Sequence, residues 1–419
     1  MEPSLTTGAG APVAPFSTPG AATDLWLLVS VFAGVCLGTA SGLTPGLHAN
    51  NFALLLAAVA PSAPAPQSCV VAAMLAAGVV HTFLDVVPAL ALGVPDPAMA
   101  ASALPGHRLV LGGRGREALR LSALGSGAAL VLAALLAVPA TELMTAVYPT
   151  LLAHLSLVLA AVVVLTLAIE PSWWPRLAGL VVLALSGALG AVALPMEPGA
   201  PLPASVLTPL FAGLFGAPVL LDAIDGGGVP PQADARLLVD RRSVGVAAGT
   251  GALAGGAVGY LPGVSSAVAA TAALAGLPSE TGDRGYVVAT SGVNTANGVF
   301  ALFALVSLGS PRTGVLVAVD RVGGVPSLTV ALAAVVVAGA AGTVLVVTVG
   351  DRYLAFVGRA DSRRLSGAAL GLLVVLSLAF AGPVGVVLFA TATLVGLVPV
   401  RLRTRRVYCM GVLLVPLAL

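Results

Sequence analysis

The chain has 419 residues, of which 58% are hydrophobic and only 9% are charged, and its mean hydropathy is +1.06. This composition excludes a soluble globular domain, and a net charge of +2 excludes nucleic-acid binding through a broad basic surface. Apolar runs of about 20 residues, long enough to cross a bilayer as helices, recur along the sequence. We therefore predict an all-α, polytopic helical protein of the cytoplasmic membrane, with the lipid bilayer as its surroundings.

The first 23 residues precede the apolar runs and are rich in Ser, Thr, Pro, Gly and Ala. Such a composition cannot bury a core, so residues 1–23 are expected to form a disordered N-terminal tail. The tail contains no basic residue and thus lacks the positively charged start of a signal peptide. The first apolar helix is therefore expected to be retained.

Seven apolar segments are expected in each half of the chain, with a polar linker at residues 223–242 between the halves. The segments of the first half, residues 24–222, fall at 25–44, 47–60, 68–93, 119–139, 147–169, 177–195 and 206–221. Those of the second half, residues 243–419, fall at 243–261, 264–277, 285–309, 328–348, 366–381, 384–400 and 407–419. Seven segments followed by seven indicate a duplicated membrane unit.

Four short matches in the same order support the duplication. They are Pro45-Gly46 with Pro262-Gly263, Val80-His81-Thr82 with Val293-Asn294-Thr295, Arg108 with Arg321, and the five-residue spacing of Gly213 and Pro218 with that of Gly411 and Pro416. Because the composition is biased, any single match could arise by chance. Together they predict two repeats.

Arginines then predict how the repeats are inserted. The loop at 107–120 is rich in Arg and its counterpart near 310–327 is poor, whereas 350–365 and 401–406 are rich and their counterparts are poor. Under the positive-inside rule, this pattern indicates two inverted repeats with the Arg-rich loops in the cytoplasm and an extracytoplasmic N-terminus. One topology satisfies every loop if each Pro-Gly break is the tip of a re-entrant helical hairpin. Segment 47–60 supports this, since it would span only about 21 Å of a core about 30 Å thick.

The two Pro-Gly breaks are the first candidate binding elements. A helix that restarts after a break directs its unpaired N–H groups and positive dipole end toward the break, which favours an anion. Short polar side chains follow Pro45-Gly46 and Pro262-Gly263: His48, Asn50 and Asn51 in the first half, and Ser265 and Ser266 in the second. These residues are predicted to bind the substrate. The alternative is a pair of turns that merely end helices at the surface.

A second candidate lies in the middle of segment 68–93. His81 and Asp85 are four residues apart and share a helix face, with Thr82 beside them. A carboxylate within a membrane segment is costly and indicates a functional site, so these three residues are predicted to bind a coupling ion, H⁺ or Na⁺. The alternative is a structural Asp–His pair. The matching stretch of the second half is polar but uncharged and is assigned to substrate binding through Asn294, Thr295 and Asn297.

The stretch Ser41 to Asn50, together with Gly259 to Ser265 and Leu104-Pro105-Gly106-His107, resembles the large membrane subunit of tripartite tricarboxylate transporters, the TctA family. The resemblance spans about residues 25–419. More narrowly, the chain resembles the archaeal branch of this family. It implies ion-driven uptake of a small di- or tricarboxylate by alternating access. It also implies a small membrane subunit and an extracytoplasmic solute-binding protein as partners, and a homo-oligomer is left open.

Two alternatives remain at this point. The Pro-Gly loops are also similar to those of polyprenyl-phosphate translocases, in which the anion is a lipid headgroup. An intramembrane metallohydrolase could use His48, His81 and Asp85, although no His-Glu-x-x-His or Gly-x-Ser-x-Gly motif is present. The leading prediction is a transporter with no enzyme activity, no resident cofactor and no bound metal.

Overall fold

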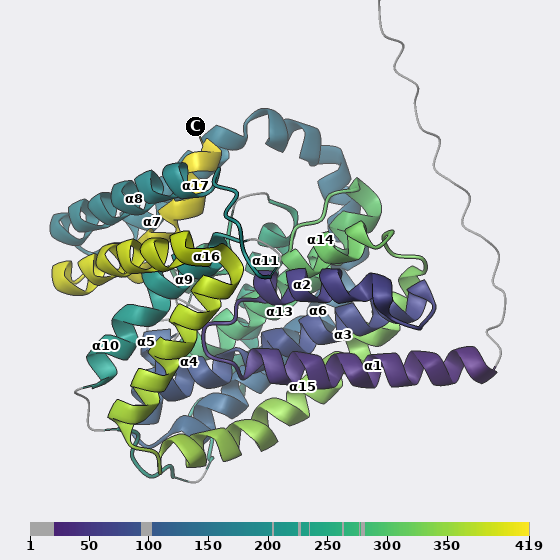
Figure 1. Cartoon of the computed structure of the whole chain (residues 1–419), viewed down its shortest axis with the longest axis horizontal. Coiled ribbons are helices and arrows are strands. Elements are labelled where there is room, and N and C mark those ends of the chain that lie inside the picture. The colour runs from purple at the N-terminus through teal and green to yellow at the C-terminus, as the bar shows by residue number, and fades with distance from the viewer. Residues whose placement is uncertain are drawn as a thin grey trace, which may run out of the picture.

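The computed structural model describes residues 21–93, 103–202, 205–224, 228–233, 235–261, 264–275, 277 and 281–418, and these residues form helices and loops without strands (Figure 1). Eight of the described helices or helix pairs are long and apolar enough to cross a membrane. The prediction of an all-α, multi-span membrane protein is confirmed. Most of the N-terminal tail, and both Pro262 and Gly263, lie outside the described residues.

The first half contains α1 (Ala21–Gly42), α2 (Ala49–Val59), α3 (Gln67–Leu84), α4 (Val86–Leu92), α5 (Ala103–Leu111), α6 (Gly115–Ala153), α7 (Leu155–Ala168), α8 (Trp173–Ala193), α9 (Leu207–Phe211) and α10 (Ala217–Ile224). The second half contains α11 (Arg241–Tyr260), α12 (Ser266–Ala275), α13 (Gly282–Leu308), α14 (Gly314–Arg321), α15 (Leu328–Val357), α16 (Ser362–Leu402) and α17 (Gly411–Ala418). Short 3₁₀ helices at Ala60–Ser62 and Arg406–Met410 and a π-helical stretch at Ala212–Gly216, which joins α9 to α10, complete the described elements.

One helix pair is built twice. Helix α1 packs along α3 and α11 packs along α13, in each case through three glycines spaced four residues apart: Gly34, Gly38 and Gly42 on α1, and Gly251, Gly255 and Gly259 on α11. A Cβ on Gly38 would lie 2.4 Å from the Ala77 carbonyl oxygen, and one on Gly255 would lie 2.7 Å from that of Val293. Small residues thus let the backbones approach as closely as they do in other membrane helix pairs.

The glycine contacts correct one of the sequence matches. A Cβ on Gly42 would meet the His81 carbonyl, and one on Gly259 would meet the Asn297 carbonyl, so His81 corresponds to Asn297. The match of Val80-His81-Thr82 with Val293-Asn294-Thr295 is therefore wrong by three residues. In a chain so rich in Ala and Val, a match at two of three positions does not determine how the two halves align. The close backbone contacts of the glycines do. Opposite insertion of the two halves stays a prediction.

Of two predicted breaks, one is absent from the structure and the other is present as a bend within a long helix. Helix α6 runs for 39 residues through Pro139 and Pro149, where the sequence predicted a loop near 140–146. Proline is tolerated inside membrane helices because neighbouring groups satisfy the freed carbonyls, so it was a poor stop signal here. Helix α16 also joins two predicted segments, but it bends at Ala381 and Gly382, where the backbone leaves helical geometry.

The turn that contains the first Pro-Gly break joins α1 to α2. Gly46 has φ of 77° and packs against Leu373 of α16, which leaves no room for a side chain. Helix α2 has 11 residues and is about 17 Å long, too short to cross the hydrocarbon core. Its length fits the predicted hairpin, and the re-entry of that hairpin into the membrane stays a prediction.

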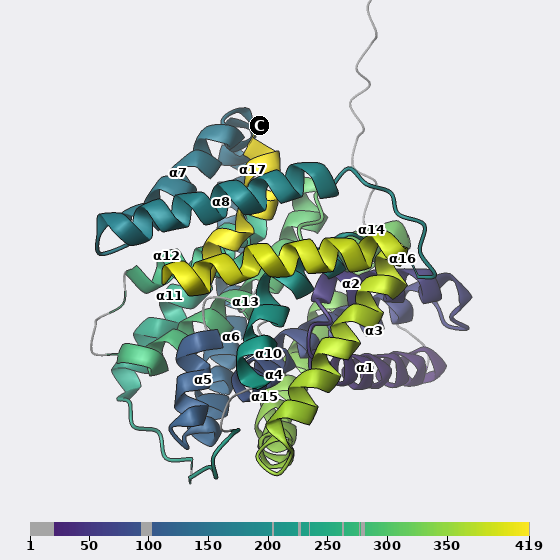
Figure 2. The ribbon, with the colours of Figure 1, turned by 60° about the vertical axis from the view of Figure 1, so that its left-hand side comes forward.

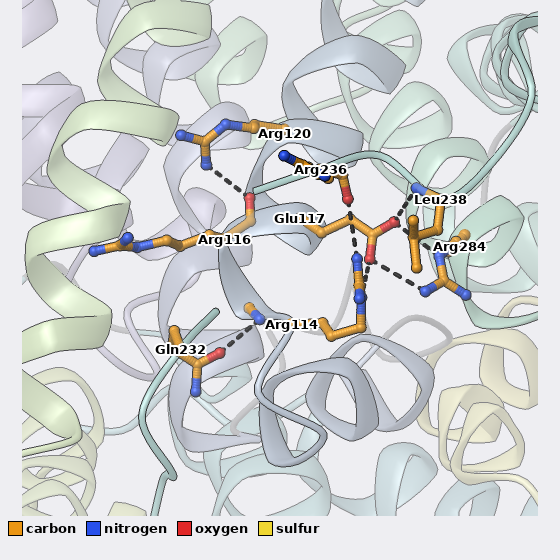
Figure 3. A network of polar contacts seen from close by, with 9 residues as sticks. Arg114, Arg116, Glu117, Arg120, Gln232, Arg236, Leu238 and Arg284 are labelled. Atoms are coloured by element: carbon orange, nitrogen blue, oxygen red, sulfur yellow. Dashed lines mark hydrogen bonds and ion pairs between the residues drawn. The ribbon is translucent and has the colours of Figure 1, made fainter. Parts of the chain in front are cut away.

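Charged residues from the predicted cytoplasmic loops meet at one end of the molecule. Glu117 at the start of α6 is fully buried, and it pairs with Arg114 and with Arg284 of α13 (Figure 3). Oε1 of Glu117, which accepts from Nε of Arg284, also accepts the N–H of Leu238 and thereby holds the segment that connects the two halves. Figure 2 shows α5, α10 and the turn between α15 and α16 at this same end. The Arg-rich loops 107–120 and 350–365 also meet here, since Arg120 lies 3.5 Å from Asp351.

Candidate functional site

A cavity of about 410 Å³ lies between the two halves of the chain. Helices α2, α3, α12, α13 and α14 surround it, so each half contributes both a short helix and a long one. The cavity brings together most of the polar residues predicted from the sequence. Those that line it are His48, Asn50, Thr82, Asp85, Ser265, Ser266, Asn294, Thr295 and Asn297.

Asp85 lies at the junction of α3 and α4, where the first half contacts α13. The Nδ2 of Asn294 donates a hydrogen bond of 2.8 Å to Oδ2 of Asp85, and both residues are 5% exposed. The same amide lies 3.4 Å from the carbonyl oxygen of Thr82. The carboxylate is thus held against a neutral donor from the other half, within a cavity wall.

The start of α2 is capped by the residue that follows the Pro-Gly turn. Nδ1 of His48 accepts the backbone N–H of Asn50 at 2.9 Å, and its ring stacks on Phe211. The Oδ1 of Asn50 in turn accepts the N–H of Gly314, the first residue of α14, at 2.9 Å. The N-termini of α2 and α14 are therefore tied to each other at the cavity, although they are 264 residues apart.

The start of α12 faces the cavity from the second half. Ser265 accepts the N–H of Val268 as a helix cap, and Ser266 accepts a hydrogen bond of 3.1 Å from Asn297. Thr295 lines the cavity and is 3% exposed, and its hydroxyl has no hydrogen-bond partner among the described residues. A buried hydroxyl without a partner is costly unless a ligand or water completes it.

Three helix N-termini thus line one cavity, those of α2, α12 and α14. Caps from His48, Asn50, Ser265 and Thr313 occupy some first-turn N–H groups, and each end still carries a partial positive charge of roughly half an elementary charge. Such ends bind carboxylates and phosphates without a formal charge. The described residues of this cavity can therefore hold an anion beside a buried carboxylate.

Four predicted residues lie elsewhere. Pro45 and Gly46 form the turn that positions α2 and do not line the cavity, and Asn51 accepts a hydrogen bond from Ser205 on the far side of α2. His81 is buried between α1 and α3, where its Nδ1 lies 2.9 Å from Oγ of Ser41. These positions support the cavity wall from behind. The predicted coupling role of His81 stays a prediction.

The sequence reasoning missed Arg312, which lines the cavity from the loop between α13 and α14. In the sequence, Arg312 is one of only two arginines in the stretch 310–327, and that stretch is poor in Arg compared with its counterpart at 107–120. A signal was present in the duplicated Leu-Gly-x-Pro that begins at Leu92 and again at Leu308. Gly93 and Gly309 both end their helices with positive φ, of 68° and 60°. This recurrence marks the residues after Gly309 as part of the repeated unit.

These features define a multi-pass membrane transport protein with a polar cavity between two helical units. The sequence model described as "Tripartite tricarboxylate transporter TctA family" matches residues 28–411, and the chain belongs to this family. An uncharacterized protein of Methanocaldococcus jannaschii is 25% identical over 406 residues, which cover 93% of this chain and 97% of that protein. No solved structure matches the chain.

Membership of the family decides between transport and catalysis. TctA proteins are membrane subunits of tricarboxylate-type secondary transporters and are not enzymes, which sets aside the metallohydrolase alternative. Within the described ranges, no group of three His, Cys, Asp or Glu side chains is placed to hold a metal ion. Family members in tripartite systems work with a small membrane subunit and a periplasmic binding protein.

Proposed function

We propose that this chain is an ion-coupled secondary transporter that moves a small carboxylate anion across the cytoplasmic membrane. The observation that carries the proposal is the cavity where three helix N-termini meet beside Asp85. Helix ends bind carboxylate oxygens, and the buried carboxylate binds the coupling cation. His48, Asn50, Ser265, Ser266, Asn294, Thr295 and Asn297 then provide short polar contacts to the substrate.

Asp85 is proposed to bind H⁺ or Na⁺ as the anion enters, with Thr82 beside it and His81 supporting that wall. A cation at Asp85 removes the repulsion between this carboxylate and the substrate, so each ligand favours binding of the other. This reciprocal coupling is what symport requires. Without the cation, the carboxylate of Asp85 weakens the attraction of the cavity for an incoming anion.

We propose that, during alternating access, the cavity opens toward the Arg-rich end of the molecule, where the Glu117 network lies. In α13, Arg284 precedes Asn294 by ten residues, about 15 Å, so the Glu117 network and packed helices separate the cavity from that end. Breaking the contacts of Glu117 would let one half move against the other. We place this end in the cytoplasm and the N-terminus outside, as the arginine distribution predicts.

The same proposal covers partners. A small membrane subunit and an extracytoplasmic solute-binding protein are expected to act with this chain, as they do in tripartite systems of the family. Assembly into a homo-oligomer is left open. Copurification with each product of neighbouring genes, followed by uptake with and without the receptor, tests which components are required.

The central test is uptake by the purified chain in proteoliposomes. Labelled citrate and succinate are offered under an inward H⁺ or Na⁺ gradient, and accumulation that collapses with an ionophore supports the proposal. A parallel assay follows transfer of a labelled polyprenyl phosphate between leaflets. Lipid transfer without carboxylate uptake would replace the proposal with the translocase alternative.

A further inference from the structure

We infer that Arg312 is the residue that forms an ion pair with the substrate, and that it selects anions with two negative charges over those with one. The inference rests on the proposed function, because it assigns the charge specificity of the same cavity. It adds a fixed cation to a site that the helix N-termini alone would leave without one.

The position of Arg312 is the first support. It follows the end of α13 at Leu308, in a loop that turns back so that Arg312 lines the cavity together with Thr313 and Gly314. It therefore lies next to the N-terminus of α14, which is tied to that of α2 through Asn50. The guanidinium and two helix N-termini are thus neighbours on one wall.

The state of its guanidinium is the second support. The Nε and Nη2 atoms of Arg312 are buried, and neither has a hydrogen-bond acceptor among the residues that the structure describes. Its Cζ lies 5.2 Å from the centre of the Tyr148 ring on α6, a cation–π contact that uses none of its N–H donors. Buried arginines ordinarily pair with a carboxylate or phosphate, often through two parallel hydrogen bonds. The unused donors therefore indicate an oxyanion that binds between them and the helix ends.

Charge balance gives the preferred substrate. Three helix N-termini supply roughly +1.5 and Arg312 supplies +1, so together they provide about +2.5 elementary charges. An ionised Asp85 lowers this to about +1.5, and a cation bound at Asp85 restores it. With the coupling ion present, a dianion such as succinate therefore leaves about +0.5 of this charge unbalanced, whereas a monoanion leaves about +1.5. A monoanion leaves a positive charge uncompensated, and burying it costs free energy.

Equilibrium binding to the purified chain tests the inference, with succinate, acetate and inorganic phosphate as probes at saturating Na⁺ and at neutral to slightly alkaline pH, where succinate is a dianion and acetate a monoanion. Wild type is expected to bind succinate at least tenfold more tightly than acetate. Arg312→Gln should lose at least tenfold in succinate affinity and most of this preference. Arg312→Lys should fall between them, because it keeps the charge but loses the planar fork of donors.

Two control variants separate an ion pair from a structural role. Arg321→Gln removes an exposed cation from the far end of α14 and should bind every probe like wild type. Tyr148→Leu removes the stacking partner but keeps the charge, so the preference for succinate over acetate should survive. If Arg312 only braces α6, Tyr148→Leu and Arg312→Gln will behave alike, which overturns the inference.

The outcomes for the inference and for the proposed function are distinct. Carboxylate uptake by wild type with unchanged succinate affinity in Arg312→Gln would leave the transporter standing and remove the role of Arg312. Arg312-dependent binding without gradient-driven uptake would keep the role of Arg312 in binding and overturn the proposed ion-coupled transport. Binding of phosphate alone, lost in Arg312→Gln, would keep the ion pair and discard the carboxylate. If no probe binds, both fail.

Discussion

Asn294 of α13 donates its side-chain amide to Asp85 at the end of α3, so the two halves of the chain meet through a hydrogen bond to a buried carboxylate. Movement of one half against the other must keep, lengthen or exchange this bond. A cation that binds Asp85 would compete with it directly. The pair is therefore a point where ion binding and conformational change can be linked.

Asp85→Asn is expected to reduce gradient-driven accumulation of carboxylate at least tenfold, while exchange of substrate across the membrane continues. The amide is isosteric but binds neither H⁺ nor Na⁺ as a carboxylate does. Accumulation and exchange are measured in the same proteoliposomes, with Asp320→Asn at the exposed end of α14 as the control. Undiminished accumulation by Asp85→Asn would remove this residue from the coupling role.

Glu117→Gln is expected to destabilise the fold by about 2 kcal/mol, because it leaves two arginines facing a neutral group. The value lies below that for fully buried ion pairs, since Arg114 and Arg284 are 28% and 26% exposed. Thermal unfolding in detergent measures the loss. Glu142→Gln, at an exposed position of the same helix, should unfold like wild type, and equal midpoints for both variants would contradict the proposed weight of this network.

Gly46→Ala is expected to destabilise the turn that positions α2 and to weaken substrate binding. Left-handed backbone costs an L-residue roughly 1–2 kcal/mol, and the new methyl group would also displace Leu373. Gly371→Ala is the matched control, because it lies on a helix with open space at its Cβ and should be neutral or slightly stabilising. Wild-type stability and succinate affinity in Gly46→Ala would show that the turn tolerates other geometry.

Stability is expected to fall as the pH decreases below about 6.5, partly through His107 on α5. Burial lowers the pKa of His107, against the raising effect of its 2.7 Å hydrogen bond to the Leu90 carbonyl. The folded state then binds this proton less readily than the unfolded state, so protonation favours unfolding. His107→Asn can keep the hydrogen bond without titrating, and its unfolding midpoint should depend less on pH between 7 and 5.5. Parallel pH profiles would exclude His107 as the cause.

Cysteine labelling tests the orientation of the halves. In a variant with Cys36 replaced by Ala, Ser62→Cys should react with an impermeant reagent from outside whole cells, and Arg242→Cys only after permeabilisation. Ser62 follows α2, and Arg242 opens α11 at the Arg-rich end. Labelling of both residues from the same side would contradict the inverted arrangement.

Sequence periodicity and length predicted the helices well, because apolar runs near 20 residues have few other solutions in a bilayer. The cavity was partly predictable for a local reason: His48 and Ser265 follow Pro-Gly motifs and each caps the next helix. The position of Arg312 was harder to predict: the recurring Leu-Gly-x-Pro marks its loop as part of a repeat, but nothing local shows that the loop turns back toward α2. The residue of the second half that corresponds to His81 was also not predicted correctly, because the correspondence depends on where the glycines of α1 contact α3.

The packing of α6 against α13 has a consequence for biogenesis. The first half leaves the ribosome and enters the bilayer before α13 exists, so the face of α6 around Gly125 must initially contact acyl chains. In the finished protein, a Cβ at Gly125 would lie 2.2 Å from the Val288 carbonyl oxygen. This face consists of small residues, and the hydroxyls of Ser122 and Ser126 on it acquire their hydrogen bonds to Ser291 only when α13 docks. The first half can therefore remain in the membrane as a metastable precursor until the second half is translated and docks against it.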